Sequence, residues 1–346
     1  MIGFGIIGAG LMGKHRANAL LKIEGVQLRS AFDPDRERAA ALPGPAAGFG
    51  VESSYQAVLE RKDVDAVVIA VPHFLAAEIV EAAFQAGKHV LCEKPLGRNT
   101  QECWRALSVK PTDKVFCAGF NYRYYPAIRE AKRLIGEGAL GELTHMRFML
   151  GHGGRPGMEK EWKVSRELCG GGALLDPGIH AIDLVRHLAG EVEEASASLF
   201  RSFWPIDVCD NAFVQLRTAG NRHAQLHVSI TEWKSRFAME LCGTNGMLEI
   251  RGRSGTYGAQ RFLLTPRWHW LDKTAKTPEF VHYPPEDTSF AAEVRAFVDA
   301  IGGTVDPAMA TALDAVAALE LVDGVYQASK PQLDSFRPQE VVSLAS

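Results

Sequence analysis

Two histidines and two aspartates follow a run of three glycines at positions 170–172, and three of these four residues recur at helical spacing. The pattern predicts a helix that starts near Pro177 and places His180, Asp183 and His187 on one face, with Asp176 just above it. A histidine held by a carboxylate beside a hydride acceptor is the usual acid–base arrangement for oxidising an alcohol. Asp176 and His180 are therefore candidate catalytic residues that also contact the substrate.

Other interpretations of this segment stay open. Asp176 stands before a proline and could cap the helix instead of acting in catalysis. His187 could be an ordinary surface residue. The set His180, Asp183 and His187 could bind a metal ion, but no further ligand pattern lies nearby, and we predict no metal site.

Lys94 is a second candidate catalytic residue, in the sequence Glu93-Lys94-Pro95 that follows a short apolar run. In an open parallel sheet the carboxyl ends of the strands line the ligand crevice. A lysine there could donate a proton to a substrate oxygen or take one, if burial and a nicotinamide cation lowered its pKa. The alternative is a solvated loop lysine.

A glycine-rich turn at the N-terminus predicts dinucleotide binding. An apolar run leads into Gly8-x-Gly10-x-x-Gly13, and a helical pattern follows. Gly8 would permit the tight turn, Gly10 would let backbone approach a pyrophosphate, and Gly13 would let the helix pack on the strand. The phosphates would bind N–H groups at the start of that helix. The two residues between Gly10 and Gly13, Leu11 and Met12, would also contact the cofactor.

Asp33 follows the second apolar run, 26–32, and stands twenty residues after Gly13. A carboxylate there can accept both ribose hydroxyls of an adenosine and would repel a 2'-phosphate, which favours NAD, although NADP stays possible. Because Pro34 follows, Asp33 could also cap the next helix, and both roles can hold.

Two domains are expected from the order of the elements. Strand-like and helix-like segments alternate from Ile2 to about Gly119, which is typical of a doubly wound parallel sheet. Beyond Asn121 the strands become alternating and antiparallel, with a hairpin at 244–246. We therefore predict an α/β protein with a dinucleotide-binding domain at 1–121 and a second domain, for substrate binding and oligomerisation, at 122–346. The expected strands are 3–7, 26–32, 47–49, 66–71, 89–92, 115–118, 142–150, 222–230, 237–242 and 247–251, and the expected C-terminal helices are 126–136, 287–301 and 307–328.

A long polar segment, 151–172, lies in the second domain, and loops of this length are usually functional or mobile. Trp162 could stack on a sugar ring, and Arg155 and Lys163 could hold a phosphate or carboxylate, as in a nucleotide sugar or uronate. The alternative is a solvated loop with the tryptophan folded onto the core.

The composition excludes several classes of protein. The chain has 346 residues, 38 basic and 41 acidic, so no basic field for nucleic acid is implied. No apolar run approaches a membrane span, and no export signal opens the sequence. The six cysteines form no Cys-x-x-Cys pair. We expect a cytoplasmic protein whose partners are a small substrate and further copies of itself.

Four motifs together resemble the glucose–fructose oxidoreductase, inositol dehydrogenase and MocA family. They are the glycine turn at 8–13, Ala86-Gly-Lys-His-Val-Leu-Cys-Glu-Lys-Pro95, Asn121-Tyr-Arg-Tyr-Tyr-Pro126, and the segment 170–183. The resemblance covers almost the whole chain, and the second and fourth motifs are specific to the family. It implies a Rossmann domain followed by an α/β domain with a large, mostly antiparallel open sheet, which in relatives often forms dimer or tetramer contacts.

The resemblance also implies hydride transfer at a sugar or cyclitol carbon. By motif, Lys94, Asp176 and His180 are the catalytic residues, and Pro95 follows a cis peptide bond beside the nicotinamide. Tyr122 and Arg123 resemble substrate or cofactor contacts.

The residues around Pro72 depart from the family pattern. Relatives often carry Asn and, three residues later, His, where this chain has His73 and Ala76. We predict that Pro72, His73 and Glu93 contact the cofactor together with Lys94 and Pro95, although the altered positions change the detail of that contact.

These features lead to an NAD(P)-dependent dehydrogenase or reductase that acts on a polyhydroxylated ring, with either His180 or Lys94 moving the hydroxyl proton. Two alternatives come from the same resemblance. One is an NAD-dependent glycoside hydrolase that oxidises its substrate transiently, and the other is a non-catalytic cofactor-binding regulator. Retention of Lys94, Asp176 and His180 argues against the regulator.

Overall fold

The computed structural model describes residues 1–271, 279–283 and 286–335, and the chain divides into two compact units. Unit 1 comprises Met1–Tyr124, Leu168–Gly170 and Thr288–Glu320, and unit 2 comprises Tyr125–Glu167, Gly171–Asp287 and the chain from Leu321 onward. The sequence predicted one boundary near residue 121. This lies close to Tyr124, where the first segment of unit 1 ends, but residues 168–170 and 288–320 also belong to unit 1.

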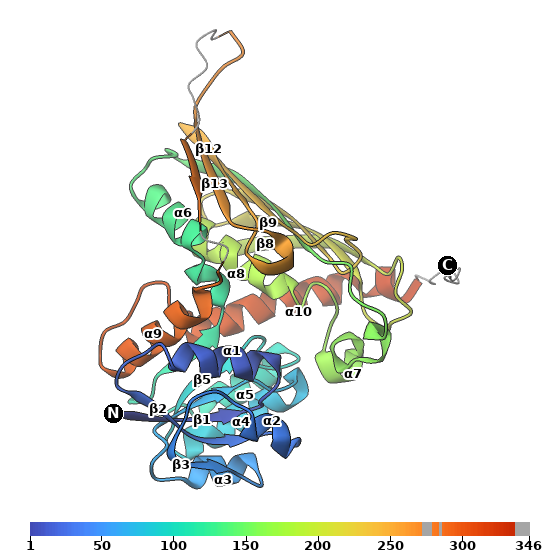
Figure 1. The fold of residues 1–346 in the computed structure, drawn as a ribbon. Helices are drawn as coiled ribbons and strands as arrows, with labels where there is room; N and C mark the ends of the chain where they lie inside the picture. Colours follow the sequence, from blue (N-terminus) through green and yellow to red (C-terminus); the bar gives the residue numbers. More distant parts are fainter. Residues whose placement is uncertain (272–278, 284–285, 336–346) are drawn as a thin grey trace. The chain divides into compact units, whose positions relative to one another are not determined.

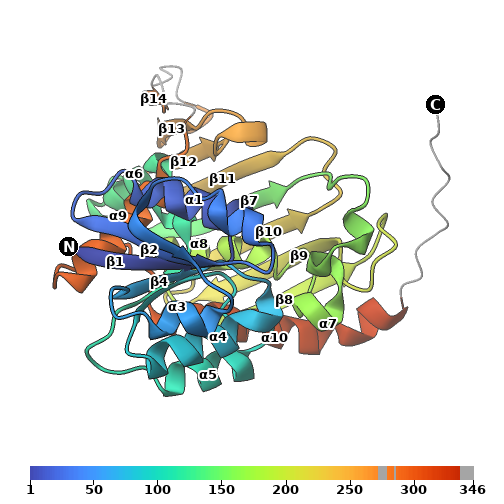
Figure 2. The same ribbon diagram turned by 60° about the horizontal axis from the view of Figure 1, so that its bottom comes forward.

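Unit 1 is built on a six-stranded sheet with the order β3-β2-β1-β4-β5-β6, and its neighbouring strands are parallel. This is the predicted doubly wound Rossmann sheet (Figure 2). The strands are β1 Ile2–Ile7, β2 Val26–Phe32, β3 Pro45–Val51, β4 Ala66–Ile69, β5 His89–Glu93 and β6 Phe116–Gly119.

Helices cover both faces of this sheet because its central strands, such as β1 and β4, are buried on both sides. Phe4 and Ile6 of β1 pack with Phe297 of α9, and Phe4 meets Phe297 edge to face at 6.2 Å between ring centroids. The next residue, Gly5, faces Val58 of α3 on the other side. The helices of unit 1 are α1 Leu11–Leu20, α2 Arg36–Ala40, α3 Tyr55–Glu60, α4 His73–Gln85, α5 Thr100–Ser108, the 3₁₀ turn η1 Asn121–Tyr124, and α9 Ser289–Ile301.

The packing of α9 explains why residues 288–320 belong with unit 1. Val294 and Phe297 are fully buried in the same apolar cluster as the first strand and helix. Burying such side chains stabilises the fold by roughly 1.5–3 kcal/mol each. No local pattern reveals this pairing, since the partners lie about three hundred residues apart in the sequence.

The cap of α2 differs from the prediction. Asp35, not Asp33, is the N-cap, and its carboxylate accepts hydrogen bonds from the N–H groups of Glu37 and Arg38 at 3.1 and 3.4 Å. The helix therefore starts two residues later than Asp33-Pro34 suggested, and the Asp33 carboxylate has other partners.

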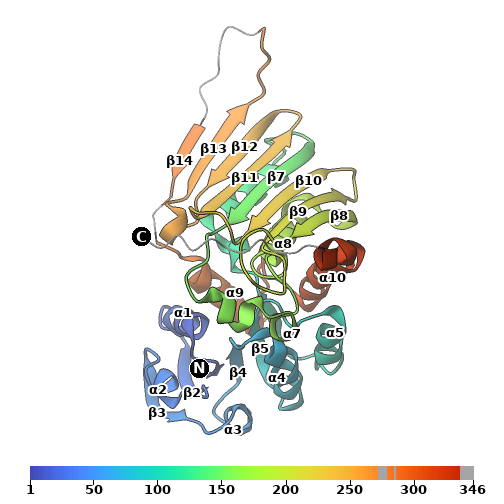
Figure 3. The same ribbon diagram turned by 90° about the vertical axis from the view of Figure 1, so that its right-hand side faces the viewer.

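Unit 2 contains an eight-stranded sheet with the order β14-β13-β12-β11-β7-β10-β9-β8, and the strands lie side by side in this order in Figure 3. Only β7 and β10 pair in parallel among its described neighbours, so the predicted mostly antiparallel open sheet is confirmed. The predicted hairpin at 244–246 joins β11 to β12. The strands are β7 Leu143–Gly151, β8 Val192–Phe200, β9 Asn211–Thr218, β10 His223–Ser229, β11 Arg236–Gly243, β12 Gly246–Arg251, β13 Arg261–Pro266 and β14 Glu279–His282.

One face of this sheet carries helices, as Figure 1 shows for α6 and α8. Ala224, Leu226 and Val228 of β10 are buried on that face, as the period-2 pattern predicts. The helices are α6 Pro126–Gly136, α8 Gly178–Ala189 and the part of α10 from Leu321 onward. The polar segment 151–172 contains the short turns η2 Met158–Lys160 and η3 Trp162–Val164 and the helix α7 Arg166–Cys169.

The last helix, α10 Ala312–Ser335, begins later than the predicted residue 307. Thr311 and Asp314 cap it reciprocally: Asp314 accepts from the N–H and hydroxyl of Thr311, and the Asp314 N–H donates to the Thr311 hydroxyl at 3.3 Å. No helix in the described part of the chain is both long and apolar enough to cross a membrane.

Candidate dinucleotide and substrate site

The three glycines of the first turn have three different environments. Gly8 has φ +95°, and a Cβ there would overlap the carbonyl oxygen of Ala70. A Cβ at Gly13 would overlap the carbonyl oxygen of Gly8. A Cβ at Gly10 would meet nothing within 4 Å. Gly8 and Gly13 are thus required by packing inside the protein, whereas Gly10 faces open space of the kind a pyrophosphate needs.

The start of α1 offers further groups to an anion. Gly10 occupies the N-cap position of α1 without a side-chain cap. The first-turn N–H groups of a helix have no partner within the helix, so they and the helix dipole favour phosphate. Leu11 is 72% exposed and Met12 is half-buried in this turn. Both side chains are thus at least partly accessible, and their contacts with a cofactor stay a prediction.

Asp33 is fixed beside the glycine turn. Its side chain is largely buried; Oδ2 accepts from the Ala9 N–H at 2.7 Å and Oδ1 accepts from the Asp35 N–H at 2.9 Å. Each carboxylate oxygen has a second lone pair for a ribose hydroxyl. The geometry therefore places an oriented negative charge at the end of β2, where the ribose of an adenosine would bind.

His73, at the position that departs from the family pattern, is the first residue of α4 and is buried. Its Nδ1 lies 3.0 Å from the carbonyl oxygen of Cys169 and 3.4 Å from the Cys169 Sγ. Because a carbonyl only accepts, Nδ1 carries the proton, and Nε2 is an acceptor in the neutral ring. Pro72 holds the N-cap position of the same helix.

The end of β5 is held by a residue that the sequence analysis missed. Glu93 receives a hydrogen bond from Nε of Arg16, a fully buried side chain of α1, at 2.7 Å. Lys94 follows, half-buried, and the peptide bond from Lys94 to Pro95 is cis, as the resemblance implied. An arginine in an otherwise apolar helix face is the sequence signal that could have revealed this pair.

Tyr122 and Arg123, predicted to contact substrate or cofactor, are buried in unit 1. Arg123 forms an ion pair with Asp314 at 3.0 Å. Burial opposes ionisation of Asp314, but the charge of Arg123 and hydrogen bonds from Thr311 and Arg123 outweigh it and lower the pKa of Asp314 to about 2. Arg123 thus stabilises the start of α10, and a ligand contact for it stays a prediction.

The glycine run before Asp176 is required by packing within the protein. A Cβ at Gly171 would crowd the ring of Tyr326, and one at Gly172 would overlap the backbone of Cys209. The Gly172 N–H donates to the Tyr326 hydroxyl at 2.9 Å. The run therefore lets the chain approach its neighbours closely before α8 begins.

The candidate catalytic residues of unit 2 lie at the start of α8. His180 and Asp183 are buried, and His187 is half-buried. Pro177 occupies the N-cap position, and no side chain caps the helix, so the alternative in which Asp176 caps α8 is wrong. Asp176 itself is half-buried and precedes a second cis proline bond.

His152 is a further candidate site residue, which the sequence did not predict. It directly follows β7; its Nδ1 accepts from the Gly154 N–H at 3.0 Å, and its carbonyl accepts from the Glu232 N–H at 3.2 Å. Burial lowers the pKa of His152, the Asp176 carboxylate opposes this, and Arg253 adds to it. The structure thus brings His152 and Asp176 together, and a histidine at the carboxyl end of a predicted strand was the available signal.

Arg155 and Lys163, the two cationic residues predicted to contact the substrate, have partners within the polar segment. Arg155 forms an ion pair with Glu161 at 2.8 Å, and the Lys163 ammonium lies 5.9 Å from the centroid of the Trp162 ring. Another exposed aromatic side chain, Trp233, packs edge to face on Phe203 at 4.7 Å and was not predicted.

The predicted site residues are divided between the units. Lys94 and the dinucleotide residues belong to unit 1, and Asp176, His180, Arg155, Trp162 and Lys163 belong to unit 2. Among the residues that the structure describes, no group of three or more His, Cys, Asp or Glu side chains is placed to hold a metal ion.

A Rossmann sheet with an open glycine turn, followed by an antiparallel α/β unit with buried histidine and carboxylate groups, defines a dinucleotide-dependent oxidoreductase class. Residues 2–118 match the oxidoreductase family with an NAD-binding Rossmann fold, and residues 128–249 match the GFO/IDH/MocA C-terminal domain. The chain belongs to the Gfo/Idh/MocA family of oxidoreductases.

Named relatives agree with this assignment. The chain is 36% identical over 207 residues to levoglucosan dehydrogenase of Pseudarthrobacter phenanthrenivorans, covering 56% of this chain and 53% of the relative, so this match spans about half of that protein. It is 29% identical over 303 residues to dTDP-3,4-didehydro-2,6-dideoxy-alpha-D-glucose 3-reductase of Actinomadura kijaniata, covering 86% of each. A solved levoglucosan dehydrogenase in complex with NADH and levoglucosan has a TM-score of 0.82 and 25% identity, over 96% of this chain and 98% of that one.

Proposed function

We propose that this protein is an NAD(P)-dependent dehydrogenase or reductase that transfers a hydride between nicotinamide and a carbon of a sugar, sugar derivative or cyclitol. The observation that carries the proposal is the glycine turn, where Gly10 faces open space beside the oriented Asp33 carboxylate. Relatives named as a levoglucosan dehydrogenase and a dTDP-sugar reductase support the substrate class.

In this proposal the bound nicotinamide supplies the hydride acceptor or donor. The residues of the protein bind the dinucleotide through the glycine turn and Asp33, align the ring, and move the hydroxyl proton. His180 or Lys94 takes that proton in the oxidative direction, and Asp176 orients the pair and balances its charge. Burial lowers the pKa of His152, which favours a neutral imidazole beside Asp176.

The substrate is a polyhydroxylated ring. Trp162 is proposed to stack on its apolar face, and Tyr122, Arg123, Arg155 and Lys163 are its proposed polar contacts. Since Arg155 is paired with Glu161, an uncharged ring is favoured over a phosphorylated one. Equal turnover of a free sugar and its nucleotide-linked form would exclude a phosphate clamp, and strong preference for the linked form would restore it.

We also propose that the protein acts in the cytoplasm as a homodimer or homotetramer that associates through the sheet of unit 2. Support comes from the exposed face of that sheet, where Phe213 is 42% exposed. Its ring stacks with Phe200 and His227, and aromatic residues are enriched at interfaces between subunits.

Parallel titrations of NADH and NADPH, followed by nicotinamide fluorescence, test the first step. Tight NADH binding with weaker NADPH binding is expected, and screening of sugars and cyclitols with NAD then follows. Lys94→Ala and His180→Ala should each lower turnover by roughly two to four powers of ten while leaving NADH binding nearly intact. Wild-type turnover in both variants would remove these residues from the mechanism.

The same preparation separates the alternatives. A glycoside hydrolase would cleave a chromogenic glycoside with catalytic NAD and no net NADH formation. A regulator would bind the cofactor and turn over neither kind of substrate.

A further inference from the structure

Arg16 occupies an unusual place for a charged residue. It is fully buried on α1, three residues after Gly13 of the dinucleotide turn. Its Nε and Nη2 both contact Oε1 of Glu93 at 2.7 Å, and its Nη1 contacts Oε2 of Glu293 at 2.5 Å. Glu93 ends β5, and Glu293, also fully buried, lies on α9. We refer to these three side chains as the Arg16 network.

The surrounding backbone is shaped to accommodate this network. A Cβ at Gly119, the last residue of β6, would stand 3.0 Å from both Nη2 of Arg16 and Oε2 of Glu93. Burial opposes the charge on Arg16, but Glu93 and Glu293 outweigh it and raise its pKa. A buried ion network is often no more stabilising than apolar side chains of similar volume. The network therefore calls for an explanation beyond stability, and its position beside Lys94 offers one.

We propose that Arg16 is a positioning residue for Lys94, acting through Glu93. Because Lys94 directly follows Glu93, fixing the Glu93 carboxylate fixes the backbone from which Lys94 projects. Through α1, the same arginine ties this segment to the glycine turn that would hold the cofactor phosphates. The planar guanidinium donates in several fixed directions at once, which a lysine ammonium does not reproduce. This inference rests on the proposed function, in which Lys94 handles the substrate proton.

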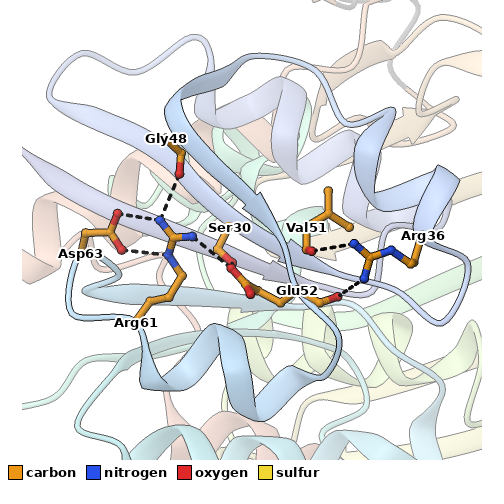
Figure 4. Close-up of polar contacts among 7 residues, drawn as sticks. All are labelled: Ser30, Arg36, Gly48, Val51, Glu52, Arg61 and Asp63. Atoms are coloured by element: carbon orange, nitrogen blue, oxygen red, sulfur yellow. Dashed lines mark hydrogen bonds and ion pairs between the residues drawn. The ribbon is translucent and has the colours of Figure 1, made fainter.

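A second network in unit 1 provides a matched control. Arg61 also lies between two carboxylates: its Nη1 contacts Glu52 at 3.0 Å, and its Nη2 contacts Asp63 at 2.8 Å (Figure 4). It also donates to the carbonyl of Gly48 at 3.1 Å. None of these residues has a proposed role in the site. Arg61→Met thus removes the same chemistry from the same unit without disturbing Glu93.

The test compares three variants in the full chain. The double variant Arg16→Met/Glu293→Gln removes one positive and one negative charge, so the net charge of the network is unchanged. The fully buried position 293 then carries no charge, and only Glu93, whose side chain is 11% exposed, loses its cationic partner. We expect kcat to fall about tenfold to a hundredfold, the effect of a small misplacement of a catalytic group. The KM for substrate and the Kd for NADH should change less than about threefold.

Arg16→Lys keeps the charge and should retain more of kcat than the double variant does, and Arg61→Met should leave kcat unchanged. A parallel loss of NADH binding and kcat in the Arg16 variants would instead make Arg16 a structural element of the nucleotide fold, which overturns the proposal.

A second readout needs no substrate. Trace acetylation with acetic anhydride, read by mass spectrometry, gives the reactivity of the Lys94 amine relative to exposed Lys62 in the same sample. The double variant should change this ratio by about threefold or more, since amine reactivity follows exposure and pKa. Arg61→Met should not change it. An unchanged ratio in all variants would overturn the positioning role, whereas an absence of turnover in the wild-type protein would overturn only the proposed function.

Discussion

At the scale of single residues, Asp33 links the fold to the choice of cofactor. Its two oxygens already accept from the N–H groups of Ala9 and Asp35, so the carboxylate is held in one orientation. Asp33→Asn keeps an acceptor but loses the charge and one ribose acceptor. Because each hydrogen bond to a charged group contributes about 1.5–3 kcal/mol, the Kd for NADH should rise about tenfold or more. NADPH should lose less affinity or gain some, as the repulsion of its 2'-phosphate is removed.

Fluorescence titration with both cofactors measures this prediction. Asp35→Asn is the control, since Asp35 lies two residues away and caps α2 through its own carboxylate. The control should leave the ratio of the two dissociation constants within about twofold of wild type. An unchanged ratio in Asp33→Asn would remove Asp33 from cofactor selection.

The local structure around a residue could be predicted from the sequence where that residue stands in a short, recognisable motif. The three glycines of the first turn and the Lys94-Pro95 pair stand in short motifs, and the cis bond at Pro95 followed from the family pattern. Arg16 and His152 were not predicted. The partners of Arg16 lie 77 and 277 residues away, and His152 acquires its importance from Asp176, so neither environment exists until the chain has folded.

At the scale of elements, strong periodicity gave correct helices and strands, but strands β8, β9, β13 and β14 were not predicted, and a capping pair changed the start of α10. The helix at 126–136 and the strand at 26–32 have the predicted bounds. The predicted helix started at residue 307, whereas α10 starts at Ala312 because Thr311 and Asp314 cap it there. Asp314 also forms an ion pair with Arg123. A proline near a helix start is a weaker signal than a complete capping pair.

The cap of α10 predicts a dependence of stability on pH. The pKa of Asp314 is about 2 in the folded protein and 3.8 ordinarily, so folding favours the charged form. The resulting stabilisation, about 2 kcal/mol, is present above pH ~4 and is lost as the pH falls from about 4 to about 2. Asp314→Asn should therefore lower the urea midpoint at pH 7 and approach wild type near pH 2.

Urea unfolding followed by tryptophan fluorescence at several pH values measures this difference. Glu24→Gln, which neutralises an exposed carboxylate of the same unit, should shift the midpoint little at any pH. A difference between Asp314→Asn and wild type that stays constant from pH 7 to pH 2 would show that the ion pair with Arg123 is not its source.

At the scale of the whole molecule, the sheet of unit 2 presents a face suited to a second copy of the chain. Phe213 of β9 stacks between Phe200 of β8, at 6.0 Å, and His227 of β10, at 3.9 Å. On neighbouring strands, Glu240 forms ion pairs with Arg147 and Arg251. Apolar rings beside a row of alternating charges can meet their own copies across a twofold axis, because such an interface must be self-complementary.

If the proposed oligomer forms through this face, Phe213→Glu should raise its dissociation constant by about tenfold or more, since aromatic residues at the centre of an interface carry much of its energy. Sedimentation velocity over a range of concentrations measures this. Val109→Glu adds the same charge at a partly exposed apolar position of unit 1 and should leave the association unchanged. If the wild-type protein sediments as a monomer at every concentration, this face has another use. If Phe213→Glu associates as wild type does, the interface lies on a different surface.

Turnover of the dissociated variant tests whether association and catalysis in unit 2 are separate. Asp176 and His180 lie on the segment that enters α8, whereas Phe213 lies on the opposite side of the sheet from the buried residues of β9. Loss of association should therefore leave kcat within about twofold of wild type.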